Sequence, residues 1–414
     1  MVFRRFWVLL SGTTAAQILP LISAPIIARG YDAAEFGIFG IYLAIAAICA
    51  TVANFKYENA ILATHSRAAT NAILGLSIFI NIGIGLVITL IVSVAILMGW
   101  QVPMGMPLAL SIFMPVSVML AGMQQAMSNV ALQKEQFALL AKSRFVAALT
   151  TAALSVLAAL TYPTAAALIA ATLVGQIAGL LLLIYKCQQK NQIKPSFQSS
   201  RLRALALRQW RFAFYTSPAD LLNALGSNLP AIFLGSLYGT AATGAYVLAQ
   251  RLVGTPLMLV GSAFSDLYRQ QVGQRVSDKR PYWGLSLKLL AITTPIGASA
   301  LALVLVFSEA GSKFFLGDQW DLAGTICSIM VWVYVLRFIV SPLTYSFYVA
   351  KRHAEDLGLQ AVSILAVSTV YLAGKYLHWA VETYVSALAW SLSIMYASYG
   401  TRALQFARRS RTVD

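Results

Sequence analysis

The stretch AILGLSIFINIGIGLVITLIVSVAILM, residues 72–98, contains no charged residue and only four polar side chains. It exceeds the roughly 20 apolar residues that a helix needs to cross about 30 Å of hydrocarbon. The whole chain of 414 residues is 59% hydrophobic and 11% charged, whereas a soluble domain carries roughly 25% charged residues. This composition excludes a soluble enzyme and predicts a polytopic membrane protein.

Similar apolar runs recur along the chain, and each is long enough to span a bilayer. The prediction is an all-α membrane protein with twelve transmembrane helices in two six-helix lobes. The approximate bounds of the twelve spans are 6–28, 36–55, 72–98, 107–131, 143–161, 164–185, 212–237, 241–264, 284–307, 322–349, 357–376 and 381–404. The first run follows Arg4 and Arg5 but is longer than a secretory signal and contains two prolines, so we interpret it as a retained span.

The distribution of Lys and Arg predicts the orientation. With the N-terminus inside, 24 of the 30 Lys and Arg residues fall in inner segments and three fall in outer segments. Because loops on the cytoplasmic side carry the excess of positive charge, we expect both termini in the cytoplasm. The net charge of +16 follows from the same rule and does not indicate a nucleic-acid partner.

The chain divides near its middle at KCQQKNQIKPSFQSSRLRALALRQWR, residues 186–211, which holds seven Lys or Arg and no acid. We predict an N-terminal lobe at 1–185, this linker at 186–211 and a C-terminal lobe at 212–414. The end of the linker can form a basic amphipathic helix, with Leu202, Leu205 and Trp210 toward apolar surface. Such a helix either rests on anionic headgroups or binds a regulatory partner.

A weak internal repeat supports this division. Tyr31, Ala34 and Gly37 match Tyr238, Ala241 and Gly244 at a constant offset of 207 residues. Both copies join an odd-numbered span to the next span at the outer face. Two halves in the same orientation are related by an axis along the membrane normal, an arrangement in which transporters bind their cargo between the halves.

Asp220, Arg251 and Arg337 lie near the centres of long apolar stretches that we predict to span the membrane. A charge at the bilayer centre costs about 2.5–3.5 kcal/mol on insertion scales, so it faces a cavity or a partner. The guanidinium fork matches phosphate oxygens or a sugar carboxylate and stays charged. A purely structural alternative is that one arginine pairs with Asp220 to hold the C-terminal half together. One acid cannot pair with both arginines, which leaves a positive surplus.

Other polar residues extend this candidate site. Asn223 lies one turn after Asp220, on a stripe that also contains Ser217 and Ser227, and span one has Ser11, Thr14 and Gln17. Tyr334 lies one turn before Arg337 and can stack on a sugar face. Arg29 and Lys56 lie nearer the two mouths of the N-terminal half, where they either contact cargo or extend to headgroups. The candidates for cargo binding are Arg251, Arg337, Asn223, Tyr334, Arg29 and Lys56, and Asp220 is the candidate for ion coupling.

Two stretches resemble a known family. Residues 11–62, SGTTAAQILPLISAPIIARGYDAAEFGIFGIYLAIAAICATVANFKYENAIL, are similar to the first two spans of bacterial oligosaccharide flippases, which include the O-antigen translocases. The matching parts are SGTTAAQ, PIIAR, Gly-Ile-Phe at 37–39 and Lys-Tyr-Glu at 56–58. Residues 239–256, GTAATGAYVLAQRLVGTP, resemble the start of span eight. These flippases belong to the multidrug/oligosaccharidyl-lipid/polysaccharide exporter superfamily.

The resemblance implies a carrier of the bacterial cytoplasmic membrane that flips an undecaprenyl-pyrophosphate-linked oligosaccharide for assembly of a surface polysaccharide. It implies two lobes in a V that opens alternately to each side. The expected partners are the lipid-linked oligosaccharide, membrane lipids and other polysaccharide-assembly proteins. No cofactor is expected apart from H⁺ or Na⁺ as a coupling ion, because the sequence holds no nucleotide loop and no metal-ligand spacing.

Two other functions compete with this one. A cation-coupled multidrug antiporter of the same superfamily would use the same halves, but acids should prevail in its cavity. A membrane-embedded glycan polymerase or ligase would be an enzyme with a sizeable outer catalytic loop, whereas the longest outer connection here is only about residues 308–321. The two arginines favour an anionic cargo, and the short outer connections favour a protein that is not an enzyme.

Overall fold

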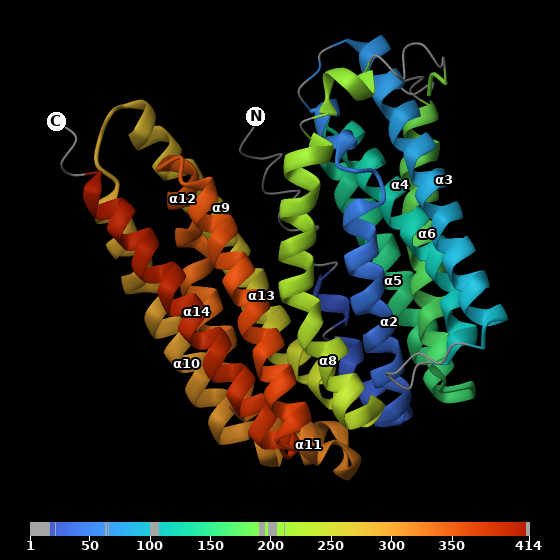
Figure 1. The fold of residues 1–414 in the computed structure, drawn as a ribbon, viewed down its shortest axis with the longest axis vertical. Coiled ribbons are helices and arrows are strands. Elements are labelled where there is room, and N and C mark those ends of the chain that lie inside the picture. Colours follow the sequence, from blue (N-terminus) through green and yellow to red (C-terminus); the bar gives the residue numbers. More distant parts are fainter. Residues whose placement is uncertain are drawn as a thin grey trace. The chain divides into compact units, whose positions relative to one another are not determined.

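The computed structural model describes residues 17–20, 22–62, 64, 66–99, 107–189, 195–197, 205–210 and 212–410. These residues are almost entirely helical and include no β-strand (Figure 1). The chain forms two compact units, residues 1–243 and 244–414. The predicted all-α class is confirmed.

Unit 1 contains a helix at Gln17–Gly30 followed by long helices that lie side by side (Figure 1). They are α2 (Ala33–Val52), α3 (Arg67–Leu97), α4 (Met114–Gln133), α5 (Phe137–Thr161), α6 (Ala165–Gln189) and most of α8 (Ser217–Ala249). Shorter segments join them: the 3₁₀ helices η1 (Tyr57–Ile61) and η2 (Leu108–Phe113), and the π-helix η3 (Phe212–Thr216).

Unit 2 begins within α8 and continues through a second π-helix, η4 (Gln250–Gly254). Its long helices are α9 (Thr255–Ser277), α10 (Trp283–Leu316), α11 (Asp321–Val340), α13 (His353–Tyr376) and α14 (Val381–Arg409). The 3₁₀ helices η5 (Asp318–Trp320) and η6 (Ser341–Thr344) and the short helix α12 (Tyr345–Val349) complete the unit.

Nine helical segments of the described chain are long and apolar enough to cross a membrane. One of them, Ser217–Ser277, is 61 residues long and covers the two predicted spans 212–237 and 241–264. Gln17–Gly30 and α14 fall outside the nine, the first because it is short and the second because it is more polar. Together these helices account for the twelve predicted spans.

The long segment contains two helices that meet at a break at Gly239, which lies between the two predicted spans 212–237 and 241–264. Gly239 has φ 81° and ψ −176°, a backbone conformation that only glycine adopts readily. The offset of the internal repeat pairs Gly239 with Asp32, which immediately precedes α2. Both copies of the repeat therefore lie at a junction between two helices.

Small residues bring neighbouring helices together. A Cβ atom on Gly175 would lie 2.0 Å from Oγ1 of Thr151, so α5 and α6 approach closely there. One turn later Ser143 donates a hydrogen bond of 2.7 Å to the carbonyl of Gly179. Packing through Gly and Ser at close range is the usual means of helix association in membranes, where lipid removes the hydrophobic driving force.

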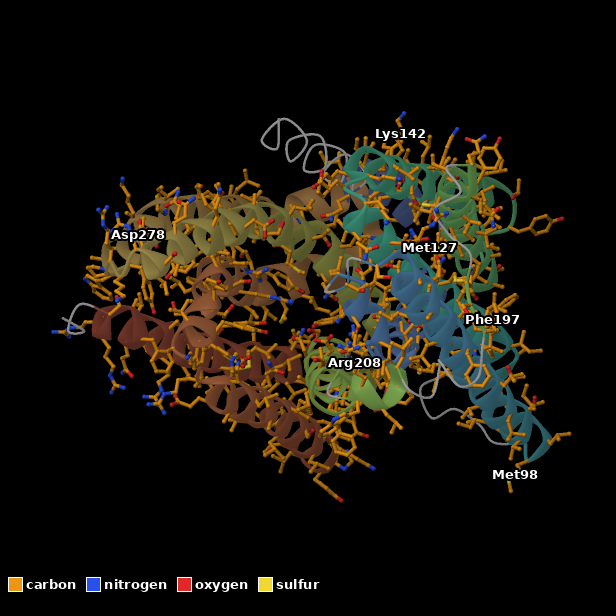
Figure 2. All side chains as sticks on the ribbon, turned by 90° about the horizontal axis from the view of Figure 1, so that it is seen from above. Met98, Met127, Lys142, Phe197, Arg208 and Asp278 are labelled. Atoms are coloured by element: carbon orange, nitrogen blue, oxygen red, sulfur yellow. The ribbon has the colours of Figure 1, made fainter. Side chains whose placement is uncertain are left out.

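The second part of the linker packs against unit 1. Residues 205–208 are helical, and Leu205 packs beside Tyr57, whose hydroxyl donates to the carbonyl of Ala206 at 3.3 Å. Arg208 is exposed on this helix (Figure 2). Trp210 is 44% exposed and packs edge to face with Phe214, and Leu202 lies outside the described residues. The predicted lobe boundary at 211/212 stays a prediction; the compact units divide later, within α8.

Candidate functional site

Lys56 and Asp220 form an ion pair in unit 1, with 2.9 Å between Nζ and Oδ2. Asp220 lies in the first turn of α8, nearer the helix end than the sequence predicted. The Lys56 side chain is 15% exposed and that of Asp220 is 44% exposed. An arginine of the C-terminal half was the alternative partner for Asp220. In the structure Asp220 pairs instead with a lysine from the segment between α2 and η1.

The backbone turns sharply to place Lys56. Phe55 and Lys56 have φ values of 45° and 60°, so two consecutive non-glycine residues adopt the left-handed conformation. Each such residue costs of order 1–3 kcal/mol and persists only when the surroundings fix it. The turn ends α2 and starts η1, and it directs the lysine side chain toward α8.

Glu58 is a further charged residue of this site, and it lies outside the spans that the sequence predicts. It follows Lys56 by two residues, is 2% exposed, and its Oε2 atom has no hydrogen-bond partner among the described residues. Burial raises the pKa of this carboxyl, while its own main-chain N–H, the charge of Lys56 and a hydrogen bond from Asn54 oppose that rise. The Lys-Tyr-Glu element at 56–58 was the one signal in the sequence that marked it.

A network of buried amides lies behind this turn. Asn54 is 1% exposed and donates to the carbonyl of Gly122 at 2.7 Å, and Asn81 donates to Oδ1 of Asn54 at 3.0 Å. A Cβ atom on Gly122 would lie 1.8 Å from the Asn81 amide nitrogen. The network therefore depends on glycine at position 122, and it joins α3 and α4 to the end of α2.

The helix η1 is held from its other side by α4. Asn129 donates to the carbonyl of Glu58 at 3.0 Å and to Oδ1 of Asn59 at 3.2 Å. Gln133 donates to the carbonyls of Ile61 and Thr64 at 2.7 and 2.6 Å. These bonds satisfy main-chain carbonyls that a five-residue 3₁₀ helix leaves free, and so fix the position of Glu58.

Unit 2 gathers three of the predicted cargo residues near one another along two packed elements. Arg251 lies in the π-helix η4, and a widened turn of this kind is common at functional sites. A Cβ atom on Gly254 would lie 3.1 Å from the ring of Tyr334, so η4 packs directly against α11 at this point. Tyr334 and Arg337 follow each other by one turn on α11.

Arg337 lies within electrostatic range of two tyrosine hydroxyls, those of Tyr246 on α8 and Tyr334 on α11. Tyr396 on α14 lies within the same range of both. Tyr246 and Tyr334 are 4% and 6% exposed, and the Tyr334 hydroxyl has no hydrogen-bond partner among the described residues. Within the described chain no carboxylate forms an ion pair with Arg337. These residues, Arg251, Tyr246, Tyr334, Arg337 and Tyr396, form what we call the arginine–tyrosine cluster.

The remaining candidates lie apart from these contacts. Asn223 is exposed on α8 and Arg29 is exposed near the end of the first helix. Gln17 is exposed, and Ser11 and Thr14 lie outside the described residues. Among the residues that the structure covers, no three His, Cys, Asp or Glu side chains gather as ligands for a metal. The structure thus offers two sets of polar groups: a lysine with two carboxyls in unit 1, and arginines with tyrosines in unit 2.

Comparison of the sequence with known proteins gives two matches. A model of the family described as "polysaccharide biosynthesis protein" matches residues 14–324. The lipopolysaccharide biosynthesis protein WzxC of Escherichia coli (strain K12) is 23% identical over 341 residues, which cover 81% of this chain and 67% of WzxC.

Solved structures share the fold. The lipid II flippase MurJ in an inward closed conformation superposes with a TM-score of 0.75 at 12% identity, covering 98% of this chain and 91% of MurJ. An inward-facing multidrug resistance transporter of the MATE family, in the MOP superfamily, gives a TM-score of 0.69 at 14% identity, with 96% of each chain covered. At these identities the similarity shows a shared fold and no more.

Proposed function

This chain belongs to the polysaccharide biosynthesis protein family, and from that membership we propose that it is a flippase for a lipid-linked oligosaccharide. The cargo is an oligosaccharide on undecaprenyl pyrophosphate, carried across the bacterial cytoplasmic membrane for assembly of a surface polysaccharide. The relatives support this class of cargo, since WzxC is named for lipopolysaccharide biosynthesis and MurJ is a flippase of lipid II.

The observation that carries the proposal is the arginine–tyrosine cluster of unit 2. A pyrophosphate group is anionic, and guanidinium groups match its oxygens with two parallel hydrogen bonds. Arg337 has no ion-pair partner among the described residues, so its charge is available for such a ligand. The Tyr334 hydroxyl, which has no hydrogen-bond partner in the part of the chain that the structure describes, supplies a donor for a phosphate or sugar oxygen.

The proposed mechanism is alternating access through a cationic central cavity. The arginines hold the headgroup while the polyprenyl tail remains in lipid, because moving an unpaired pyrophosphate through a low-dielectric space is prohibitively expensive. No covalent step is needed, since the cargo leaves as it entered. The excess of Lys and Arg in the predicted inner segments supports an orientation with both termini cytoplasmic.

The test is a flipping assay in liposomes. The full chain is reconstituted with lipid-linked oligosaccharide extracted from bacterial membranes, and access of the glycan to a lectin that cannot cross the bilayer is followed. We expect the accessible fraction to rise faster than in protein-free liposomes. If the protein instead transports a cationic dye and leaves the glycan distribution unchanged, it is a multidrug antiporter, the alternative that the MATE-like fold would also accommodate.

We further propose that Asp220 takes part in coupling transport to an H⁺ or Na⁺ gradient. Asp220→Asn removes the acid from the pair with Lys56 and is expected to abolish the acceleration of flipping by an imposed gradient. The measurement compares initial flipping rates with and without each gradient in the same liposomes. An Asp220→Asn protein whose rate responds to pH and Na⁺ as the wild type does would remove Asp220 from this role.

A further inference from the structure

The charges around Lys56 do not balance. Two carboxyls, Glu58 and Asp220, lie within electrostatic reach of one lysine, and Lys56 forms its 2.9 Å ion pair with Asp220. Glu58 is the one acidic side chain that is fully buried in the described part of the chain. An ionised carboxylate buried without its own cation is strongly disfavoured, and the group takes up a proton instead.

Among the described residues, the charged groups that act on Glu58 are Lys56 and Asp220 and no others. The helices packed against η1 are α3, α4 and η3. They face this region with neutral groups, the amides of Asn81, Asn129 and Gln133. The charged groups that act on Glu58 are Lys56, on its own segment, and Asp220, on α8. The protonation of Glu58 therefore depends on how Lys56 is shared between two acids.

We infer that Glu58 is a proton-binding site that controls the ion pair between Lys56 and Asp220 in the first turn of α8. The inference rests on the buried Oε2 atom without a hydrogen-bond partner among the described residues, and on the single lysine that two acids share. With Oε2 protonated, the Lys56–Asp220 pair is electrically neutral and stays closed. When the proton leaves to water, the new carboxylate attracts Lys56, and the hold of Lys56 on Asp220 weakens. One proton is bound or released in each change of state.

The position of Asp220 gives this switch a route to the cargo residues. Asp220 lies in the first turn of α8, whose first helix runs to the break at Gly239. The second helix of α8 follows this break and leads into η4, which holds Arg251. Release of the first turn thus frees one end of the helix whose other end is the break at Gly239. This coupling to transport rests on the proposed flippase function, whereas the proton site itself does not.

The proton site can be tested by infrared difference spectroscopy on the purified full-length protein, without any cargo. A titration from about pH 5 to 9 leaves ordinary carboxyls ionised and covers the range in which buried glutamates are known to titrate. We expect the wild type to lose a protonated-carboxyl C=O band as pH rises. Glu58→Gln should lack this band entirely.

A second variant and a control make the result specific. Asp220→Asn frees Lys56 to pair with Glu58, so the band should be lost or shifted to lower pH. Asp278, at the end of α9, is exposed (Figure 2), and Asp278→Asn should leave the band unchanged. Should the band survive in Glu58→Gln, the proton site is refuted; Asp220→Asn with an unaltered band refutes the sharing of Lys56.

The outcomes separate this inference from the proposed function. If the band depends on Glu58 but the wild type flips no oligosaccharide in liposomes, the proton site stands and the flippase proposal fails. If the wild type flips oligosaccharide and the Glu58→Gln protein shows the same protonated-carboxyl band as the wild type, the flippase proposal stands and the proton site fails.

Discussion

Replacing Arg337 by alanine is expected to reduce flipping of the lipid-linked oligosaccharide at least about 30-fold, with the protein level unchanged. Removing one partner of a desolvated, hydrogen-bonded charge pair costs about 2–5 kcal/mol, and each 1.4 kcal/mol corresponds to about tenfold. Arg337 has no ion-pair partner in the described chain, so its removal leaves no protein carboxylate without a cation. The loss should therefore appear in cargo transport rather than in folding.

Arg251→Ala should have an effect of similar size, and lysine at either position should restore transport only in part. Lysine keeps the charge but lacks the planar fork that binds two phosphate oxygens at once. Arg269 is an exposed arginine on α9 of the same unit, and Arg269→Ala is the matched control that should transport normally. The readout is glycan export in cells together with the liposome assay. Normal export by both alanine variants would contradict a role for the arginines in holding an anionic headgroup.

The second large effect is expected in the stability of unit 1. Gly122→Ala places a methyl group 1.8 Å from the present position of the Asn81 amide nitrogen, so the bonds among Asn81, Asn54 and the Gly122 carbonyl cannot persist. A buried polar group left without its partner costs about 1–3 kcal/mol, and overpacking costs about 1–3 kcal/mol more. We expect a loss of about 2–5 kcal/mol in the free energy of unfolding.

This effect is measured by thermal unfolding in detergent, with the loss of monodisperse protein as the readout. Gly83 provides the control, because an added Cβ atom there meets no atom within 4 Å. Gly83→Ala should keep or raise the unfolding temperature, since alanine is about 1 kcal/mol more favourable than glycine inside a helix. Equal melting of the two variants would show that the amide network contributes little to stability.

Several features of the site were accessible from the sequence. Arg251 and Arg337 stand out because charges are rare in apolar stretches, and the structure confirms that each lies within a helical segment long enough to cross a membrane. Tyr334 was selected by its spacing from Arg337, and it does lie one turn away on α11. Such spacing is reliable because residues three apart on one helix share a face whatever surrounds them.

Other features could not be read from the chain. The segment at 53–61 reads as a polar connection between two spans, where a glutamate is ordinarily exposed. Glu58 is buried because Asn129 and Gln133 on α4 hold η1 against the bundle. The pairing of Lys56 with Asp220 joins residues 164 positions apart. Neither fact has a local signature in the sequence.

The sequence alone determined that this is a helical membrane protein with twelve spans. Each helix that crosses the hydrocarbon layer needs a long apolar run, and such runs are visible in the sequence however the helices pack. The sequence also determined which charged residues lie in apolar stretches, where burial in hydrocarbon costs so much free energy that they must face a cavity or a partner. The tertiary structure alone decided which of them meet: Lys56 with Asp220 beside a buried Glu58, and Tyr334 with the turn of Arg251 through Gly254. Contacts between distant residues arise from how helices pack, and the hydropathy of each helix does not specify that packing.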